Sequence, residues 1–169
     1  MLTISVAIVI ALAFFGVIWW CVTVGATRAF QGAAMTFTPQ NRRGELVSFE
    51  ARHERYMKIA EVITTLASAS LVFVPISRLS AYPHSCAFAL VLLGFTVLYS
   101  VAFMAMLTYF YEGFLYNAES YRPWKYGLVH AFGFGALFCF ALAYLFLAVR
   151  VGNAVIYTVS GTATSNALP

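Results

Sequence analysis

The sequence predicts an all-α integral membrane protein whose four helices form one bundle. Three long segments carry no charged residue, namely residues 1–27, 79–111 and 126–149. About 20 helical residues cross a hydrocarbon layer about 30 Å thick, and each segment exceeds that length. The composition agrees, since 62% of the chain is hydrophobic and 9% is charged, whereas soluble domains are about 25% charged. These runs do not alternate as barrel strands do, which leaves helices as the structure that satisfies the backbone in lipid.

Each helix is expected from its own segment. The first lacks a basic n-region and is too long for the core of a signal peptide, so we expect it to be retained. The second has a shorter apolar run, Val62–Ser77, but no proline or glycine separates Glu45 from Pro75, and we expect its first half to extend into the cytoplasm. Residues 152–169 are uncharged and rich in small and hydroxyl residues, which predicts a loosely ordered tail after one domain, 1–151. The expected helices cover about residues 3–27, 46–76, 85–112 and 126–150.

The basic residues predict an orientation. Eight of the ten lie in or beside the first and third loops, and only Arg78 and Arg150 lie on the other side. The positive-inside rule therefore places these two loops in the cytoplasm and both termini in a lumen or outside the cell. The net charge of +4 arises from this bias, so it does not indicate a nucleic-acid partner.

One face of the second helix carries polar residues from water into the membrane. The order Glu54 then Lys58 favours an ion pair one helical turn apart. Thr65 and Ser68 lie among alanines and suit close packing between helices. A carboxylate at the membrane boundary usually faces the bundle or a cavity, so Glu61 either packs there or belongs to a site. At 100° per residue, this face comprises Glu50, Glu54, Lys58, Glu61, Thr65 and Ser68.

The third helix carries fewer polar residues. The hydroxyls of Thr96, Ser100 and Thr108 share one face, which favours hydrogen bonds between helices. The aromatic segment that contains Tyr109 and Tyr111 fits either an interfacial belt or the wall of a ligand pocket.

Neither the histidines nor the cysteines form a recognisable metal motif. His130 stands alone in the fourth helix, without the paired ligands of a haem or metal site, so we interpret it as a structural hydrogen-bonding residue. Cys21, Cys86 and Cys139 lie in apolar surroundings without CxxC spacing, which predicts packing residues.

Three short segments carry a family resemblance. They are Thr27–Phe30, then Phe49-Glu50 followed by Glu61, and finally Tyr109–Leu115 followed by Pro123. Each is similar to a motif of the MAPEG superfamily, the membrane-associated proteins in eicosanoid and glutathione metabolism. The similar branch holds the microsomal glutathione transferases, the leukotriene-forming synthase and the lipoxygenase-activating protein. The resemblance implies a four-helix homotrimer with sites between neighbouring subunits on the cytoplasmic side.

The resemblance also implies roles for individual residues. Arg28 would be the catalytic residue, since a nearby cation stabilises a thiolate. The alternative is that Arg28 is an interfacial anchor, the commoner role of a lone arginine at a helix end. Glu61 would hold the ammonium group, and Arg122 a carboxylate, of glutathione or a related thiol as co-substrate, with no metal. Tyr109 and Tyr111 would line the pocket for a lipophilic small molecule that enters from the membrane lipids.

The chain also departs from the family pattern. The family holds its thiol peptide with an arginine and an asparagine on the second helix, where this chain has Glu54 and Lys58. Glu54 would repel an anionic peptide, and Lys58 would restore a positive charge without the fork geometry of arginine. Phe114 replaces the tyrosine that follows the glycine of the third helix. Glu50, Glu54 and Lys58 are therefore candidate substrate-binding residues with altered chemistry.

Three functions are compatible with these observations. The first is the conjugation or reduction of lipophilic electrophiles with a glutathione-type thiol at the cytoplasmic membrane interface. The second is non-catalytic lipid binding by the same fold, which the altered clamp favours. The third is an accessory role in a larger membrane complex, in which polar faces hold helices together.

Overall fold

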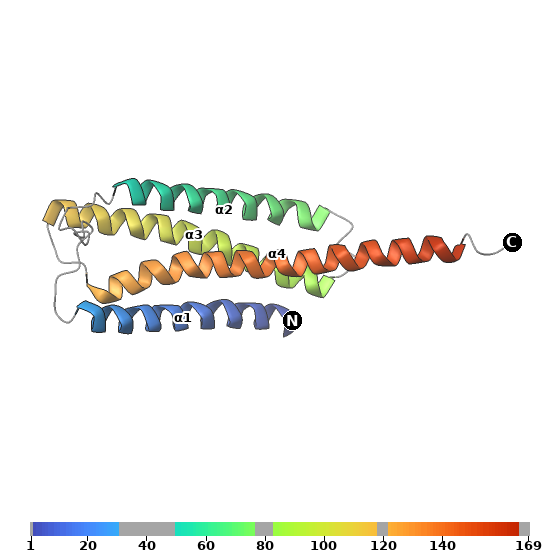
Figure 1. The fold of residues 1–169 in the computed structure, drawn as a ribbon, viewed down its shortest axis with the longest axis horizontal. Helices are drawn as coiled ribbons and strands as arrows, with labels where there is room; N and C mark the ends of the chain where they lie inside the picture. Colours follow the sequence, from blue (N-terminus) through green and yellow to red (C-terminus); the bar gives the residue numbers. More distant parts are fainter. Residues whose placement is uncertain (1, 31–49, 77–82, 118–121, 166–169) are drawn as a thin grey trace.

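The computed structural model describes residues 2–30, 50–76, 83–117 and 122–165. They form four α-helices, α1 (Leu2–Phe30), α2 (Glu50–Ile76), α3 (Pro83–Asn117) and α4 (Pro123–Ser165), which run alternately up and down (Figure 1). Each helix contains a segment long and apolar enough to cross a membrane. These segments are Thr3–Arg28, Arg52–Pro75, Cys86–Gly113 and Pro123–Asn153.

Prolines mark several helix ends. Pro83 and Pro123 are the first residues of α3 and α4, where the missing N–H costs no helical hydrogen bond. Just before α4, the carbonyl of Arg122 accepts bonds from the N–H groups of Lys125 and Tyr126, at 3.0 and 3.2 Å. Pro75 lies one residue before the end of α2, where a proline terminates a helix most readily.

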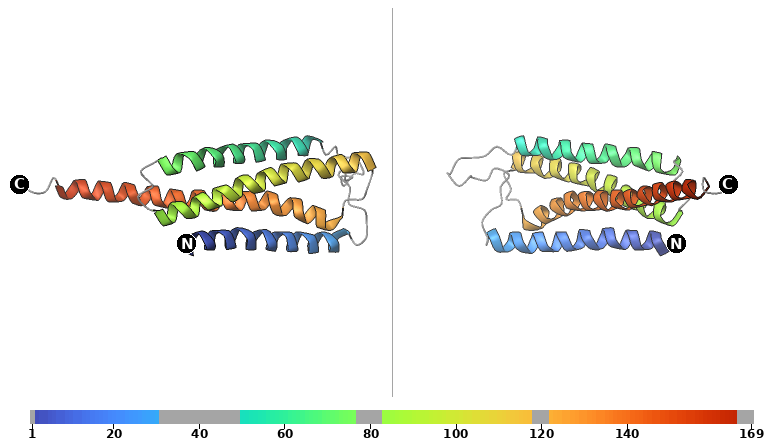
Figure 2. Two further views of the ribbon diagram at one scale, coloured as in Figure 1. Left: turned by 180° about the vertical axis from the view of Figure 1, so that it is seen from behind. Right: turned by 45° about the vertical axis from the view of Figure 1, so that its right-hand side comes forward.

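The central pair of the bundle is α3 and α4, which share the most extensive helix contact. Helix α1 packs chiefly on α4 and also on α3, whereas α2 packs chiefly on α3. Helices α1 and α2 lie at opposite edges and hardly touch, as the views in Figure 2 agree. The outer faces of α1 and α2 are therefore far apart within one chain.

Small residues permit this close packing. The main core joins alanines of α1, α2 and α4 to Leu92 and Leu93 of α3. On α4, a Cβ atom at Gly135 would lie 2.9 Å from the ring of Tyr99, so only glycine admits that ring. Such small-residue faces are how helices approach closely when lipid gives no hydrophobic driving force.

Two tyrosines of the central pair bond to the outer helices. The hydroxyl of Tyr99 on α3 donates to the carbonyl of Ala11 on α1 at 3.3 Å. The hydroxyl of Tyr144 on α4 donates to the carbonyl of Leu66 on α2, also at 3.3 Å, and contacts the hydroxyl of Ser70 at 2.5 Å. Each outer helix is thus tied to the centre by a hydroxyl bond.

One helix ends later than expected. Helix α4 does not end near residue 151 but continues to Ser165 and projects past the bundle (Figure 1). No proline follows Pro123 until Pro169, and a helix passes through glycine at a cost of only about 1 kcal/mol.

At the opposite end, α2 lies beside α3, and the expected extension of α2 into the cytoplasm stays a prediction. Its described part begins at Glu50, and His53 stacks on Tyr111, six residues before the end of α3. The expected start at residue 46 lies outside the described residues. The charged first half of α2 therefore lies beside α3 rather than past it.

Candidate functional site

The up-and-down topology brings the predicted site residues to one end of the bundle. Arg28 lies in the last turn of α1, Glu50 begins α2, and Arg122 lies immediately before α4. Tyr109 and Tyr111 lie near the end of α3. This common end is the one where the first and third loops leave the helices (Figure 1).

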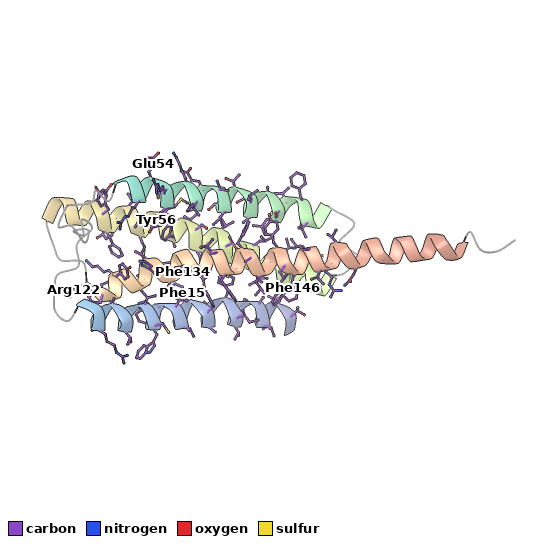
Figure 3. All side chains as sticks on the ribbon, in the orientation of Figure 1. Phe15, Glu54, Tyr56, Arg122, Phe134 and Phe146 are labelled. Atoms are coloured by element: carbon purple, nitrogen blue, oxygen red, sulfur yellow. The ribbon has the colours of Figure 1, made fainter. Side chains whose placement is uncertain are left out.

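Within one chain, these residues do not converge on a single pocket. Arg28 and Arg122 are exposed, as is Glu54 on the side of α2 turned away from α3 (Figure 3). Because α1 and α2 lie at opposite edges, Arg28 cannot meet the acidic residues of α2 in the same chain. A site that uses both helices would need a neighbouring subunit.

Glu54 and Lys58 form the predicted ion pair. The Lys58 Nζ lies 2.7 Å from the Glu54 Oε1, one helical turn away. Both side chains are exposed, at 67% for Glu54 and 69% for Lys58. The two candidate clamp residues therefore neutralise each other on the outside of α2.

The two candidate tyrosines point to different environments. Tyr109 is 72% exposed on the outside of α3. Tyr111 is half-buried and stacks on His53 of α2, with ring centroids 5.7 Å apart. Sequence reasoning missed His53, although its spacing from Ala60 and Ile63 on the buried face of α2 follows the helical period and gives a usable signal.

The histidine of the fourth helix has the structural role that was predicted. The Nδ1–H of His130 donates to the carbonyl of Tyr126, at 2.9 Å, and the two rings lie 4.0 Å apart. Among the described residues, no three His, Cys, Asp or Glu side chains gather as a metal site would require. All three cysteines lie in described helices, where Cys86 and Cys139 are buried and Cys21 is exposed.

The hydroxyls on α3 depart from the prediction of bonds between helices. Thr96 is fully buried, and its Oγ1 donates to the carbonyl of Leu92 in its own helix at 2.9 Å. Ser100 is also buried, and its Oγ has no hydrogen-bond partner among the described residues. Threonine and serine commonly bond back to the preceding turn, a choice that the sequence pattern does not reveal.

Contacts between α2 and α3 show where Glu61 lies along the length of the bundle. Tyr56 of α2 packs edge-on against Phe103 of α3, with ring centroids 6.4 Å apart. The two helices run antiparallel, so Glu61, five residues further along α2, lies level with about residue 98 of α3. This is near the middle of the α3 span, Cys86–Gly113.

The level of Glu61 along the bundle axis is also close to the middle of the spans of the other helices. Tyr99 of α3 packs against Phe15 of α1, 5.5 Å between centroids, and against Gly135 of α4. Phe15 lies about 18 Å along the helix from either end of the span Thr3–Arg28. The helix register thus places Glu61 near the middle of the length of the bundle, and its expected position at the membrane boundary stays a prediction.

The outward side of α2 therefore presents charged and hydroxyl groups within its candidate span, Arg52–Pro75. Its buried side packs on the bundle through Ala60, Ile63 and Ala67. Glu61 forms no ion pair with any residue in the described ranges. We define the α2 polar face as the exposed residues Glu54, Lys58, Glu61, Thr65 and Ser68.

The outward sides of the other three helices are apolar at this level. The exposed residues there include Leu12 and Val17 on α1, Val101 on α3, and Leu137 on α4. Such side chains suit contact with lipid tails, whereas a carboxylate in the hydrocarbon layer needs a protein partner or water.

The fold and these spans define a four-helix, multi-pass membrane protein. Comparison with known proteins finds no family model, no curated protein and no solved structure that matches the chain.

Proposed function

We propose that this chain conjugates or reduces lipophilic electrophiles with a glutathione-type thiol, at a site between neighbouring copies on the cytoplasmic side of the membrane. The observation that carries the proposal is the common end of the bundle, where Arg28, Arg122 and Tyr109 are all exposed. A soluble anionic thiol reaches these cations from water, and a lipophilic molecule reaches the same end from the bilayer. The resemblance to the MAPEG superfamily supports this chemistry and a homotrimer.

Each residue then has a defined task. Arg28 stabilises the thiolate, because a nearby cation favours the charged form of a thiol. Arg122 holds a carboxylate of the thiol peptide with its forked guanidinium group. Tyr109 contacts the lipophilic molecule. The Glu54–Lys58 pair removes the repulsion that Glu54 alone would exert on an anionic peptide.

The proposed site requires residues from two copies. Arg28 is at one edge of the chain and the acidic residues of α2 are at the other, so a neighbouring copy would have to bring them together. The mid-depth position of Glu61 limits its role: it would contact the ammonium of a thiol peptide only if the peptide or water enters between the copies.

A second candidate function is non-catalytic lipid binding by the same fold. The observation that favours it is the ion pair between Glu54 and Lys58, which occupies both positions where the family carries its clamp. In this role, the chain binds a membrane lipid rather than a thiol and catalyses no reaction.

The test is the thermal midpoint of the detergent-purified protein with and without glutathione, together with its oligomer mass. Ligand at about 100 times its dissociation constant adds about 2.7 kcal/mol of stability, which gives a measurable upward shift. We expect a shift in the unmodified chain, its loss in Arg28→Ala, and its retention in the control Arg150→Ala at the opposite end. An unmodified chain that is stabilised by lipid but not by glutathione would replace the proposal by non-catalytic lipid binding. A chain that purifies only with foreign subunits would replace it by the accessory role.

A further inference from the structure

The α2 polar face cannot be covered by lipid tails. Glu61 lies near mid-depth, and its carboxylate has no ion-pair partner in the described part of the chain. A charged side chain within a helix span is unfavourable when only lipid surrounds it, so such residues usually face a protein partner or water. Lys58, one turn nearer the boundary, extends toward Glu54, which leaves the Glu61 carboxylate exposed on the outside of the chain.

We propose that the α2 polar face is covered by α2 of a neighbouring copy of this chain, with Lys58 of each copy bridging its own Glu54 and Glu61 of the next copy in the homo-oligomer. The proposal rests on the proposed function in one respect, because the partner is another copy of the chain in the homo-oligomer. It does not depend on thiol chemistry. It concerns which surface joins the copies and which residues make the contact.

Charge complementarity favours a second copy as the occupant. Along the α2 polar face, the charges alternate in sign as Glu54, Lys58 and Glu61. Over the whole segment Glu50–Glu61 there are three acidic and three basic residues, so two such helices can pair their charges without excess. A buried charge is tolerated when it is paired in this way.

Depth also favours a second copy. Copies inserted in the same orientation carry Glu61 at the same level, so a parallel α2–α2 contact places the polar residues of the two helices opposite each other. Lys58 and Glu61 are offset by three residues, about 4.5 Å along the axis, which their side chains can span. The outward sides of α1, α3 and α4 present apolar residues at this level and offer no such match.

The composition of the face permits close approach beyond the charged residues. Thr65, Ser68 and Ala69 are exposed and follow Glu61 toward the other membrane surface. Small and hydroxyl residues at helix interfaces let backbones approach and form hydrogen bonds in lipid. The contact therefore continues from the charged level through the second half of α2.

Cysteine cross-linking in native membranes tests this contact without altering a charge. The full chain would carry Cys21→Ser, which removes the exposed thiol, together with Thr65→Cys or Ser68→Cys on α2. The matched controls are Leu98→Cys on α3 and Leu137→Cys on α4, which are exposed and lie within about two helical turns of the α2 positions along the bundle axis. We expect a disulfide-linked dimer at the α2 positions and at least about ten times less at the controls. Equal yields at all four positions, or no dimer at the α2 positions, would overturn the proposal.

A charge exchange tests the pairing itself. We expect Lys58→Glu to weaken self-association by about tenfold or more, since close interfacial charge pairs couple by at least about 1.4 kcal/mol. The double variant Lys58→Glu with Glu61→Lys should restore association to near the unmodified value. Glu54→Gln, which breaks only the exposed pair within one helix, is the matched control and should leave association unchanged.

The remaining outcomes also decide the question. A purified chain that is monomeric by mass, or whose α2 positions cross-link only to a foreign protein, contradicts the second copy as occupant. Absence of a glutathione shift in a chain that still cross-links through α2 contradicts the thiol chemistry alone. The two proposals therefore fail in distinguishable ways.

Discussion

Ser70 of α2 and Tyr144 of α4 share a hydroxyl–hydroxyl hydrogen bond of 2.5 Å across the bundle. The single hydroxyl hydrogen of Tyr144 is directed at the carbonyl of Leu66, so Ser70 donates to the tyrosine oxygen. Helices α2 and α4 make few other contacts. This small network is thus the principal link between α2 and α4, whereas α2 is held on the bundle chiefly by its packing on α3.

Tyr144→Phe removes this network while keeping the ring in place. We expect the free energy of unfolding to fall by about 0.6–1.7 kcal/mol, the range for single hydrogen bonds between helices in lipid. The measurement is unfolding of the purified protein by titration of a denaturing detergent into mild-detergent micelles. Ser70→Ala should cost less than Tyr144→Phe, because the tyrosine keeps its bond to Leu66. A larger loss for the serine variant would contradict the proposed donor order.

Gly135→Ala should destabilise the bundle. The added Cβ would lie 2.9 Å from the Tyr99 ring, closer than real Cβ contacts allow. Overpacking of this kind costs about 1–3 kcal/mol. The matched control is Gly152→Ala on the same helix, where a Cβ meets nothing within 4 Å. The control should be neutral or stabilising, because alanine favours helix over glycine by about 1 kcal/mol.

Ser100→Ala should preserve or raise stability. The Ser100 hydroxyl is 1% exposed and has no hydrogen-bond partner among the described residues, so its burial carries an uncompensated cost of about 1–3 kcal/mol. Thr96→Val is the comparison, since it keeps the side-chain shape but removes the bond to Leu92. We expect a modest loss from the valine variant and none from the alanine variant, measured by the same detergent titration. A loss of more than about 1 kcal/mol in Ser100→Ala would indicate a bonded hydroxyl.

The cysteines should differ in reactivity. Cys21 is exposed on α1, whereas Cys139 is fully buried and Cys86 is 7% exposed. An uncharged, lipophilic maleimide should therefore modify one thiol in the folded protein and three after denaturation. Mass spectrometry of the intact chain counts the additions, and Cys21→Ser should abolish the rapid one. Modification of Cys139 at the rate of Cys21 would contradict the packing of α4.

Local sequence patterns predicted the helices and the ion pair on α2. Four spans follow from run length, because about 20 apolar residues match the thickness of the hydrocarbon layer. The Glu54–Lys58 pair follows from the helical period, because residues four apart on one helix are always neighbours. Neither result depends on how the helices pack together.

Tertiary structure decided which side of each helix is buried. On α1, α3 and α4 the residues that contact lipid and those that contact protein are equally apolar, so periodicity carries no signal for orientation. The stacking of His53 on Tyr111 and the local bond of Thr96 are examples that only packing reveals. The family resemblance assigned Arg28 and Glu61 to one site, yet they lie on α1 and α2, which the fold places at opposite edges of one chain.

The position of Glu61 along the bundle shows most clearly what the sequence determines and what only the tertiary structure decides. By itself, the sequence determined that a carboxylate lies at the start of an apolar run on the second helix. Only the register between α2 and α3, fixed by contacts such as Tyr56 with Phe103, placed it near mid-depth and on the outside. The physical reason is that hydropathy depends on the composition of one helix alone. The position of a residue along the bundle axis depends instead on how the side chains of neighbouring helices pack together.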